Sequence, residues 1–186
     1  MLANVYLHYV LDEWFSEQIQ PLLKGKSFIV RYADDFVMGF TDKSDAERVM
    51  AVLPKRFAKY GLTIHPEKTK LLDLNSTRGE GYGRSFDFLG FTHFLSKSRK
   101  GRMVLKRKTS SKRLTKAIMN VSDYIMRNRH MKLNDLIAAL NVKLRGHYNY
   151  YGVTFNSRSL NSYFLMVKFR LFKWLIRRGG KVKLNW

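Results

Sequence analysis

The chain contains no cysteine, only three prolines, and no apolar run close to the roughly 20 residues that a membrane-spanning helix needs. Without cysteine it can form no disulfide and no thiolate metal site, which fits a reducing compartment. Acidic residues appear already at Asp12 and Glu13, with no basic stretch and apolar run before them, so we expect no signal peptide. These absences predict a cytoplasmic protein without a membrane partner.

Acidic residues are scarce in the second half, and this scarcity produces the formal net charge of +21. Residues 1–87 contain 12 Lys/Arg and 12 Asp/Glu, whereas residues 88–186 contain 23 Lys/Arg and two acids, Asp123 and Asp135. Such a cationic region favours nucleic acid as partner, because neutralising phosphates releases condensed counterions. A basic surface that adheres without a defined partner is the alternative.

The pattern of apolar residues predicts an α+β region followed by a helical region, with the boundary near Lys108. The expected elements are a helix over 2–19, strands over 27–32 and 36–40, a helix that opens at Ser44 with capping-box spacing and stops at Gly61, strands over 69–74, 86–95 and 102–106, a Gly/Ser-rich loop over 75–85, and three helices after residue 109, the last ended by Gly179-Gly180.

Tyr32-Ala33-Asp34-Asp35 lies between two apolar runs and is the sharpest chemical feature. Tight hairpin turns favour Asn-Gly or Asp-Gly, and adjacent carboxylates repel each other unless a cation neutralises them. Carboxylate oxygens suit Mg²⁺, and a pair of such ions can hold the attacking and leaving oxygens of a phosphoryl transfer. For a bare Asp-Asp pair, a solvated acidic turn is the more common explanation.

Five segments, in order, resemble blocks of group II intron-encoded reverse transcriptases, and together they span nearly the whole chain. Residues 2–8 (LANVYLH) resemble the helix after the template-contacting Ser-Pro block, 28–37 (FIVRYADDFV) the catalytic hairpin, 61–70 (GLTIHPEKTK) the Gly-Leu-x-Leu-x-x-x-Lys-Thr block, 86–91 (FDFLGF) the segment that grips the primer end, and 144–152 (LRGHYNYYG) the signature helix of the maturase thumb.

The resemblance implies the C-terminal half of a reverse-transcriptase palm over residues 1–95, an antiparallel sheet with packed helices. A basic connector and a three-helix maturase-type thumb, the group II intron maturase-specific domain, would follow over residues 96–186. The implied activity is RNA-directed DNA polymerisation, a nucleotidyl transfer with Mg²⁺ that uses intron or template RNA, a DNA primer and dNTP.

The family's functional positions fall on particular residues. Asp34 and Asp35 would be the catalytic carboxylates that bind the metal. The implied primer and nucleotide contacts are Tyr32, Ala33, Lys68, Phe88, Leu89, Gly90 and Phe91. Glycine allows close backbone approach, which suits Gly90 to this role. A surface lysine beside Glu67 is an equal explanation for Lys68.

Basic residues of the second half are the candidates for contacts with RNA phosphates, which position a nucleic acid without reading its sequence. They are Lys97, Arg99, Lys100, Arg102, Lys106, Arg107, Lys108, Arg145, Lys168, Arg170, Lys173, Arg177 and Arg178. The aromatic group Tyr148, Tyr150, Tyr151 and Phe155 also permits base stacking. Core packing is favoured for Tyr148 and Tyr151, because both fall on the apolar stripe of their helix.

The family pattern contains more than this sequence does. Its third metal carboxylate, its Gln-Gly and Ser-Pro template blocks and its fingers region precede the segments found here, so we expect a chain truncated at the N-terminus, and also at the C-terminus. A metal site that lacks one of its carboxylate ligands should align no nucleotide, so we expect no DNA synthesis by this chain alone. The alternatives are a non-catalytic maturase module that binds intron RNA and assists splicing, or a degenerate mobile-element remnant.

Overall fold

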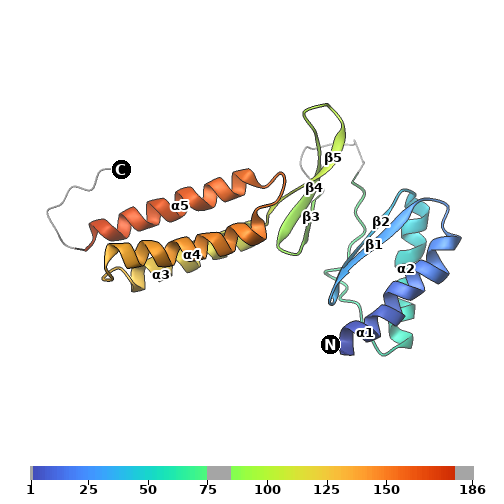
Figure 1. The fold of residues 1–186 in the computed structure, drawn as a ribbon. Helices are drawn as coiled ribbons and strands as arrows, with labels where there is room; N and C mark the ends of the chain where they lie inside the picture. The colour runs from blue at the N-terminus through green and yellow to red at the C-terminus, as the bar shows by residue number, and fades with distance from the viewer. Residues whose placement is uncertain (1, 75–84, 179–186) are drawn as a thin grey trace. The chain divides into compact units, whose positions relative to one another are not determined.

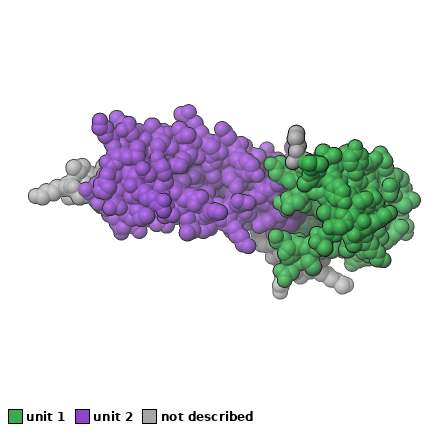
Figure 2. Space-filling model, turned by 90° about the horizontal axis from the view of Figure 1, so that it is seen from below, with its two compact units in different colours: residues 1–84 green, residues 85–186 purple. Residues whose placement is uncertain are grey.

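The computed structural model describes residues 2–74 and 85–178. The chain divides into two compact units, residues 1–84 and 85–186, which Figure 2 colours separately. Its architecture is α+β with antiparallel sheets, as predicted. The boundary between the compact units lies between residues 84 and 85, before the strands that start at residue 85. The assignment of residues 1–95 to a palm and of residues 96–186 to a thumb stays a prediction. No helix in the described ranges is long and apolar enough to cross a bilayer.

The first unit packs helices against one face of a β-hairpin (Figure 1). Its elements are α1 (Leu2–Leu7), the π-helix η1 (His8–Ile19), the short 3-10 helix η2 (Gln20–Leu22), β1 (Ser27–Tyr32), β2 (Asp35–Phe40) and α2 (Lys43–Lys59). Leu11, Trp14 and Phe15 of η1 form the core with the apolar side of α2 and with alternate side chains of the hairpin. Because neighbouring strand residues point to opposite faces, Phe28 and Val30 remain exposed on the other side.

Two local predictions for this unit were wrong. Helix α2 begins at Lys43 rather than at Ser44, because Asp42 is its N-cap and accepts a hydrogen bond from the Asp45 amide at 3.1 Å. Residues 69–74 form no strand, since they pair with no described strand and a strand exists only through its ladder. Gly61, with φ of +69°, follows the helix end as predicted.

The second unit joins a three-stranded sheet to three helices (Figure 1). The strands β3 (Ser85–Phe88), β4 (Phe91–Lys97) and β5 (Met103–Thr109) are antiparallel and adjacent in chain order. The helices α3 (Ser111–Arg127), α4 (Leu133–Tyr151) and α5 (Ser157–Ile176) enclose a core that includes Ile125, Leu136 and Tyr163. The three predicted helices are confirmed, while Gly179-Gly180 and most of the predicted loop over 75–85 lie outside the described residues.

The strand predicted over 86–95 is in fact two strands separated by a two-residue turn at Leu89 and Gly90. Both turn residues have positive φ, 51° and 79°, which reverses the chain where the apolar pattern suggested continuity. The strand predicted over 102–106 corresponds to β5, one residue later at its start and three at its end.

A fully buried asparagine connects the sheet to the helices. Asn156 accepts a hydrogen bond from the Thr109 amide at 2.7 Å and donates to the Thr109 hydroxyl and the Tyr151 carbonyl, both at 2.8 Å. It therefore ties the end of β5 to the loop between α4 and α5.

Candidate functional site

The Asp-Asp pair stands at the tip of the β1–β2 hairpin, where the sequence placed it. Tyr32 pairs with Asp35, so Ala33 and Asp34 are the two central residues of the turn. Ala33 has φ of 54°, a left-handed conformation that a residue with a Cβ seldom adopts. The side chains of Asp34 and Asp35 are exposed, and neither forms a hydrogen bond or an ion pair with any residue that the structure describes.

Arg31, immediately before the motif, holds the turn by hydrogen bonds. Its Nε and Nη2 donate to the Asp12 carboxylate of η1 at 2.6–3.0 Å, while its Nη1 donates to the Ala33 carbonyl at 2.8 Å. Arg31 and Asp12 are largely buried, with side chains 12% and 25% exposed. The guanidinium lowers the pKa of the Asp12 carboxyl, mainly by donating hydrogen bonds to its charged form. The sequence analysis missed this role of Arg31.

The turn suits a divalent cation by its donor chemistry. Two exposed carboxylates offer the hard oxygen ligands that Mg²⁺ prefers, and Arg31, the nearest cation along the chain, is bonded to Asp12 instead. Across residues 2–74 and 85–178, no three His, Asp or Glu side chains gather as a ready metal cage. Lys68 lies exposed in the turn after His65 and forms no ion pair with either aspartate.

The Leu89–Gly90 turn is the second candidate feature, and it belongs to the second unit. Phe88 and Phe91 pair across it. Tyr150 of α4 donates from its hydroxyl to the Leu89 carbonyl at 2.9 Å, and the Ser110 amide donates to the Gly90 carbonyl at 3.0 Å. Both carbonyls of the turn are therefore hydrogen-bonded from outside the hairpin.

Close packing surrounds this turn. A Cβ added to Gly90 would lie 3.1 Å from the Tyr151 hydroxyl, so glycine permits the approach of the helix. The buried Phe91 ring stacks on Tyr150 with centroids 5.9 Å apart and meets Tyr151 edge-on at 5.2 Å. The sequence pattern predicted core packing for Tyr151 and gave no signal for the contact between Tyr150 and Leu89.

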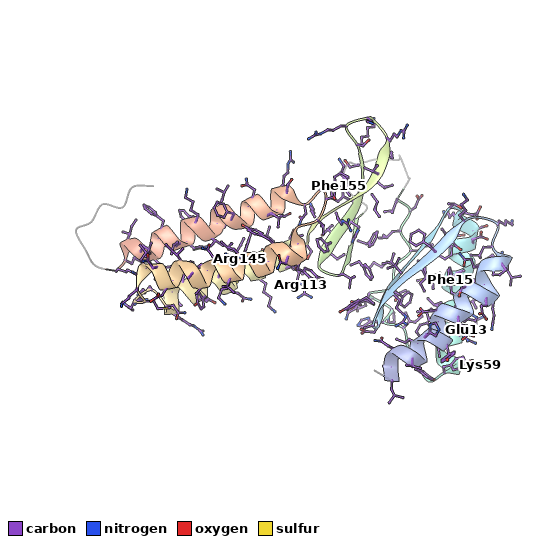
Figure 3. All side chains as sticks on the ribbon, viewed as in Figure 1. Glu13, Phe15, Lys59, Arg113, Arg145 and Phe155 are labelled. Atoms are coloured by element: carbon purple, nitrogen blue, oxygen red, sulfur yellow. The ribbon has the colours of Figure 1, made fainter. Side chains whose placement is uncertain are left out.

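The predicted RNA-contacting residues differ in how far their side chains are exposed. Arg99, Lys100 and Arg102, in or next to the β4–β5 connection, are exposed, as are Lys97, Arg107, Arg145 and Lys168, whereas Arg170 and Lys173 are half-buried. Arg145 is labelled on α4 in Figure 3.

Several of these cations contact other parts of the chain. Lys106 donates to the Lys97 carbonyl at 2.7 Å and lies 5.7 Å from the Phe155 ring. Lys108 lies over Phe94 at 5.6 Å, Arg177 lies over Trp174 at 5.0 Å, and Arg178 donates to the Met131 carbonyl at 2.7 Å.

Helix α3 adds basic residues that the sequence analysis did not select. Lys112 and Lys116 flank a shallow depression with Ser111 and Thr115, and Arg113 is labelled on the same helix in Figure 3. Their four-residue spacing places Lys112 and Lys116 on one face of the helix, and this signal was available in the sequence.

The histidines near the second core behave as packing residues. The His147 ring stacks on Tyr163 with centroids 3.8 Å apart, and burial lowers the pKa of its imidazole. Burial likewise lowers the pKa of His93, which stacks on Phe86.

Two family models match this chain. Residues 1–93 match the model described as reverse transcriptase (RNA-dependent DNA polymerase), and residues 112–186 match the group II intron, maturase-specific domain. A comparison with curated proteins gives no match. The first match spans half of the chain, and the second lies over α3 to α5. The chain therefore belongs to the reverse transcriptase family, in the group II intron type that joins a reverse transcriptase region to a maturase-specific domain.

Proposed function

We propose that Asp34 and Asp35 hold Mg²⁺ in the polymerase site of a group II intron reverse transcriptase. The observation that carries this proposal is the exposed carboxylate pair at a fixed hairpin tip, without a neutralising cation among the described side chains. Family membership supplies the reaction, which is RNA-directed DNA polymerisation, and implies nucleic acid partners. We infer that the unit that presents the pair is part of a palm, and the packing of its hairpin against helices supports this inference.

The chain's own residues would divide the remaining tasks. Bound Mg²⁺ supplies a Lewis acid that stabilises negative charge on phosphoryl oxygens. Arg31 keeps the turn in place through the Ala33 carbonyl, so that the carboxylates are presented in one geometry. Tyr32, which is exposed, and Ala33 would face the primer end and the incoming dNTP. Lys68 would offer positive charge to the triphosphate.

The second unit would hold the nucleic acid as a thumb does. Residues 88–91 would contact the primer strand at the turn, and the exposed cations of the β4–β5 connection and of α4 would contact phosphates. Residues 88–186 carry the whole net charge of the chain, which supports a polyanionic partner for this unit.

Metal binding can be tested without catalysis. Mn²⁺ replaces Mg²⁺ in hard oxygen sites and broadens nearby NMR signals, so titration of the full chain should broaden the amides of residues 33–36 first. Asp34→Asn combined with Asp35→Asn should remove this broadening. Asp123→Asn, which alters an exposed aspartate of α3, is the matched control and should leave it unchanged. Equal broadening at the turn in the double variant would refute the metal site.

Catalysis is a separate question. Two carboxylates leave most positions of a two-metal site to other ligands, and no third acidic side chain or histidine gathers with them in the described part of the chain. We expect the chain alone to incorporate no dNTP on a DNA primer annealed to an RNA template. Incorporation that disappears with Asp34→Ala would overturn this expectation.

A second candidate function is binding of intron RNA without chemistry, and the charge asymmetry between the two halves favours it. Fluorescence anisotropy with a structured intron RNA separates the candidates. If RNA binding is the whole function, Asp34→Asn with Asp35→Asn leaves affinity and splicing assistance intact. If the polymerase site operates in a complex with further chains, the same variant abolishes DNA synthesis by that complex.

A further inference from the structure

Helix α4 of the maturase-specific domain reaches the Leu89–Gly90 turn with two consecutive tyrosines. The Tyr150 hydroxyl donates to the Leu89 carbonyl at 2.9 Å, and the Tyr151 hydroxyl lies where a Cβ on Gly90 would meet it at 3.1 Å. These residues are about 60 positions apart in sequence, yet all lie in one compact unit. The contact therefore joins the sheet to the helices at the tip of the hairpin.

The conformation of the turn needs external support. Positive φ at both central residues, 51° at Leu89 and 79° at Gly90, is the pattern of a type I′ turn, which favours Asn-Gly or Gly-Gly. Glycine adopts this conformation freely, but the Cβ of leucine makes the left-handed region unfavourable. A leucine held there shows that contacts outside the turn stabilise it.

Tyr150 is placed to supply that stabilisation. Its ring stacks on Phe91, the residue after the turn, with an interplanar angle of 16°, and its hydroxyl donates a hydrogen bond to the Leu89 carbonyl. Its stacking partner and its hydroxyl partner are thus both parts of the hairpin. This double engagement also argues against Tyr150 as a free platform for a nucleic acid base.

We propose that Tyr150 is a positioning residue that holds the Leu89–Gly90 turn in its left-handed conformation for contact with the primer strand. The proposal rests on the proposed function of residues 88–91. It makes the maturase-specific helix a structural part of the primer-contacting element. A displacement of α4 would shift both the hydrogen bond of Tyr150 to the Leu89 carbonyl and its stacking on Phe91.

The test combines one deletion of a hydroxyl with one compensating change. Tyr150→Phe removes the hydrogen bond and keeps the ring on Phe91. Tyr148→Phe makes the same chemical change two residues earlier on α4, away from the turn, and is the matched control. Leu89→Asn creates an Asn-Gly turn that favours positive φ by itself, so it should compensate for the loss of the Tyr150 hydroxyl.

Two readouts are needed, both on the full chain. Hydrogen exchange of the Ser110 amide, measured by NMR, reports the turn because this amide donates to the Gly90 carbonyl. Photo-cross-linking from a 4-thiothymidine at the 3′ end of a DNA primer on an RNA template, with the modified peptide identified by mass spectrometry, reports contact with residues 86–92.

We expect Tyr150→Phe to raise exchange at Ser110 about fivefold, the factor that one ordinary hydrogen bond contributes, and to reduce the cross-link by a similar factor. Tyr148→Phe should change neither, and Leu89→Asn with Tyr150→Phe should restore the slow exchange at Ser110, which does not involve the Leu89 side chain. Unchanged exchange in Tyr150→Phe, or raised exchange with an undiminished cross-link, overturns the proposal. Absence of any cross-link to this segment in the unaltered chain instead overturns the proposed function of the segment, and with it the positioning role.

Discussion

Arg31→Lys tests whether the hairpin tip is held by a guanidinium fork rather than by positive charge alone. Arginine reaches two acceptors at once, the Asp12 carboxylate and the Ala33 carbonyl, through three different nitrogens. A lysine ammonium is a point charge on a flexible stem and cannot reproduce this fork. The substitution keeps the charge next to Asp12 and removes the geometry.

The expected cost follows from the burial of the pair. Hydrogen bonds to charged groups contribute about 1.5–3 kcal/mol when well shielded, and lysine would retain part of the attraction to Asp12. With Arg31 12% and Asp12 25% exposed, we expect the first unit to lose about 1–2 kcal/mol of unfolding free energy. Arg48→Lys, at an exposed arginine 3.7 Å from Asp45, is the matched control and should cost less than about 0.5 kcal/mol.

Urea unfolding measured by tryptophan fluorescence can isolate this unit. Trp14 is the only tryptophan in residues 1–84, so a background with Trp174→Phe and Trp186→Phe reports the first core alone. Equal midpoints for Arg31→Lys and its background at pH 7 would refute the argument that the fork holds the hairpin.

Acid provides a second test of the same pair. Because Arg31 lowers the pKa of Asp12 in the folded chain, this carboxylate stabilises the fold above its unfolded pKa of about 3.9, and the contribution is lost as pH falls through the lower folded pKa. In Arg31→Lys the pKa of Asp12 is lowered less. The stability difference between the two chains should therefore shrink below about pH 4, and a constant difference would contradict the linkage.

Three further predictions concern the second unit. Gly90→Ala should lower the unfolding free energy in chemical denaturation by about 1–2 kcal/mol more than Gly101→Ala. Both glycines have positive φ, but of the two only Gly90 has a neighbour, the Tyr151 hydroxyl, close to the position of the added Cβ. Equal losses for the two variants would contradict this argument. Asn156→Ala should cost about 2–4 kcal/mol, since it leaves buried partners of three hydrogen bonds unpaired. Arg145→Ala should reduce the slope of log affinity against log salt for RNA by about one, and an unchanged slope would remove it from the interface.

The sequence was most informative where structure is determined locally. The helices of the second unit follow from apolar spacing, and the β1–β2 hairpin follows from two apolar runs that flank Ala33-Asp34-Asp35. Gly61 ends α2 as expected, because positive φ after a helix is a local requirement that glycine meets. The exposed position of Asp34 and Asp35 also follows, since a tight turn between paired strands has no core to enter.

Sequence patterns failed where tertiary contacts decide the structure. Residues 69–74 are apolar enough for a strand, but no described strand is available to pair with them. The apolar pattern predicts a strand at Leu89, because leucine carries no local signal for positive φ. Lys106 and Arg178 could be ranked only as cations, since nothing in the sequence reveals that both donate to backbone carbonyls of their own chain.

The two candidate turns share one physical arrangement. In each, a residue with a Cβ adopts positive φ, Ala33 at 54° and Leu89 at 51°, and in each its carbonyl accepts a hydrogen bond from a long side chain, Arg31 or Tyr150. Glycine at these positions would remove the energetic cost of positive φ, but it would also increase the number of conformations that the tip of the hairpin can adopt. A turn fixed by a donor bound to a helix keeps one geometry instead. This restriction explains why a turn that must present groups to a ligand can retain a residue that turn statistics disfavour.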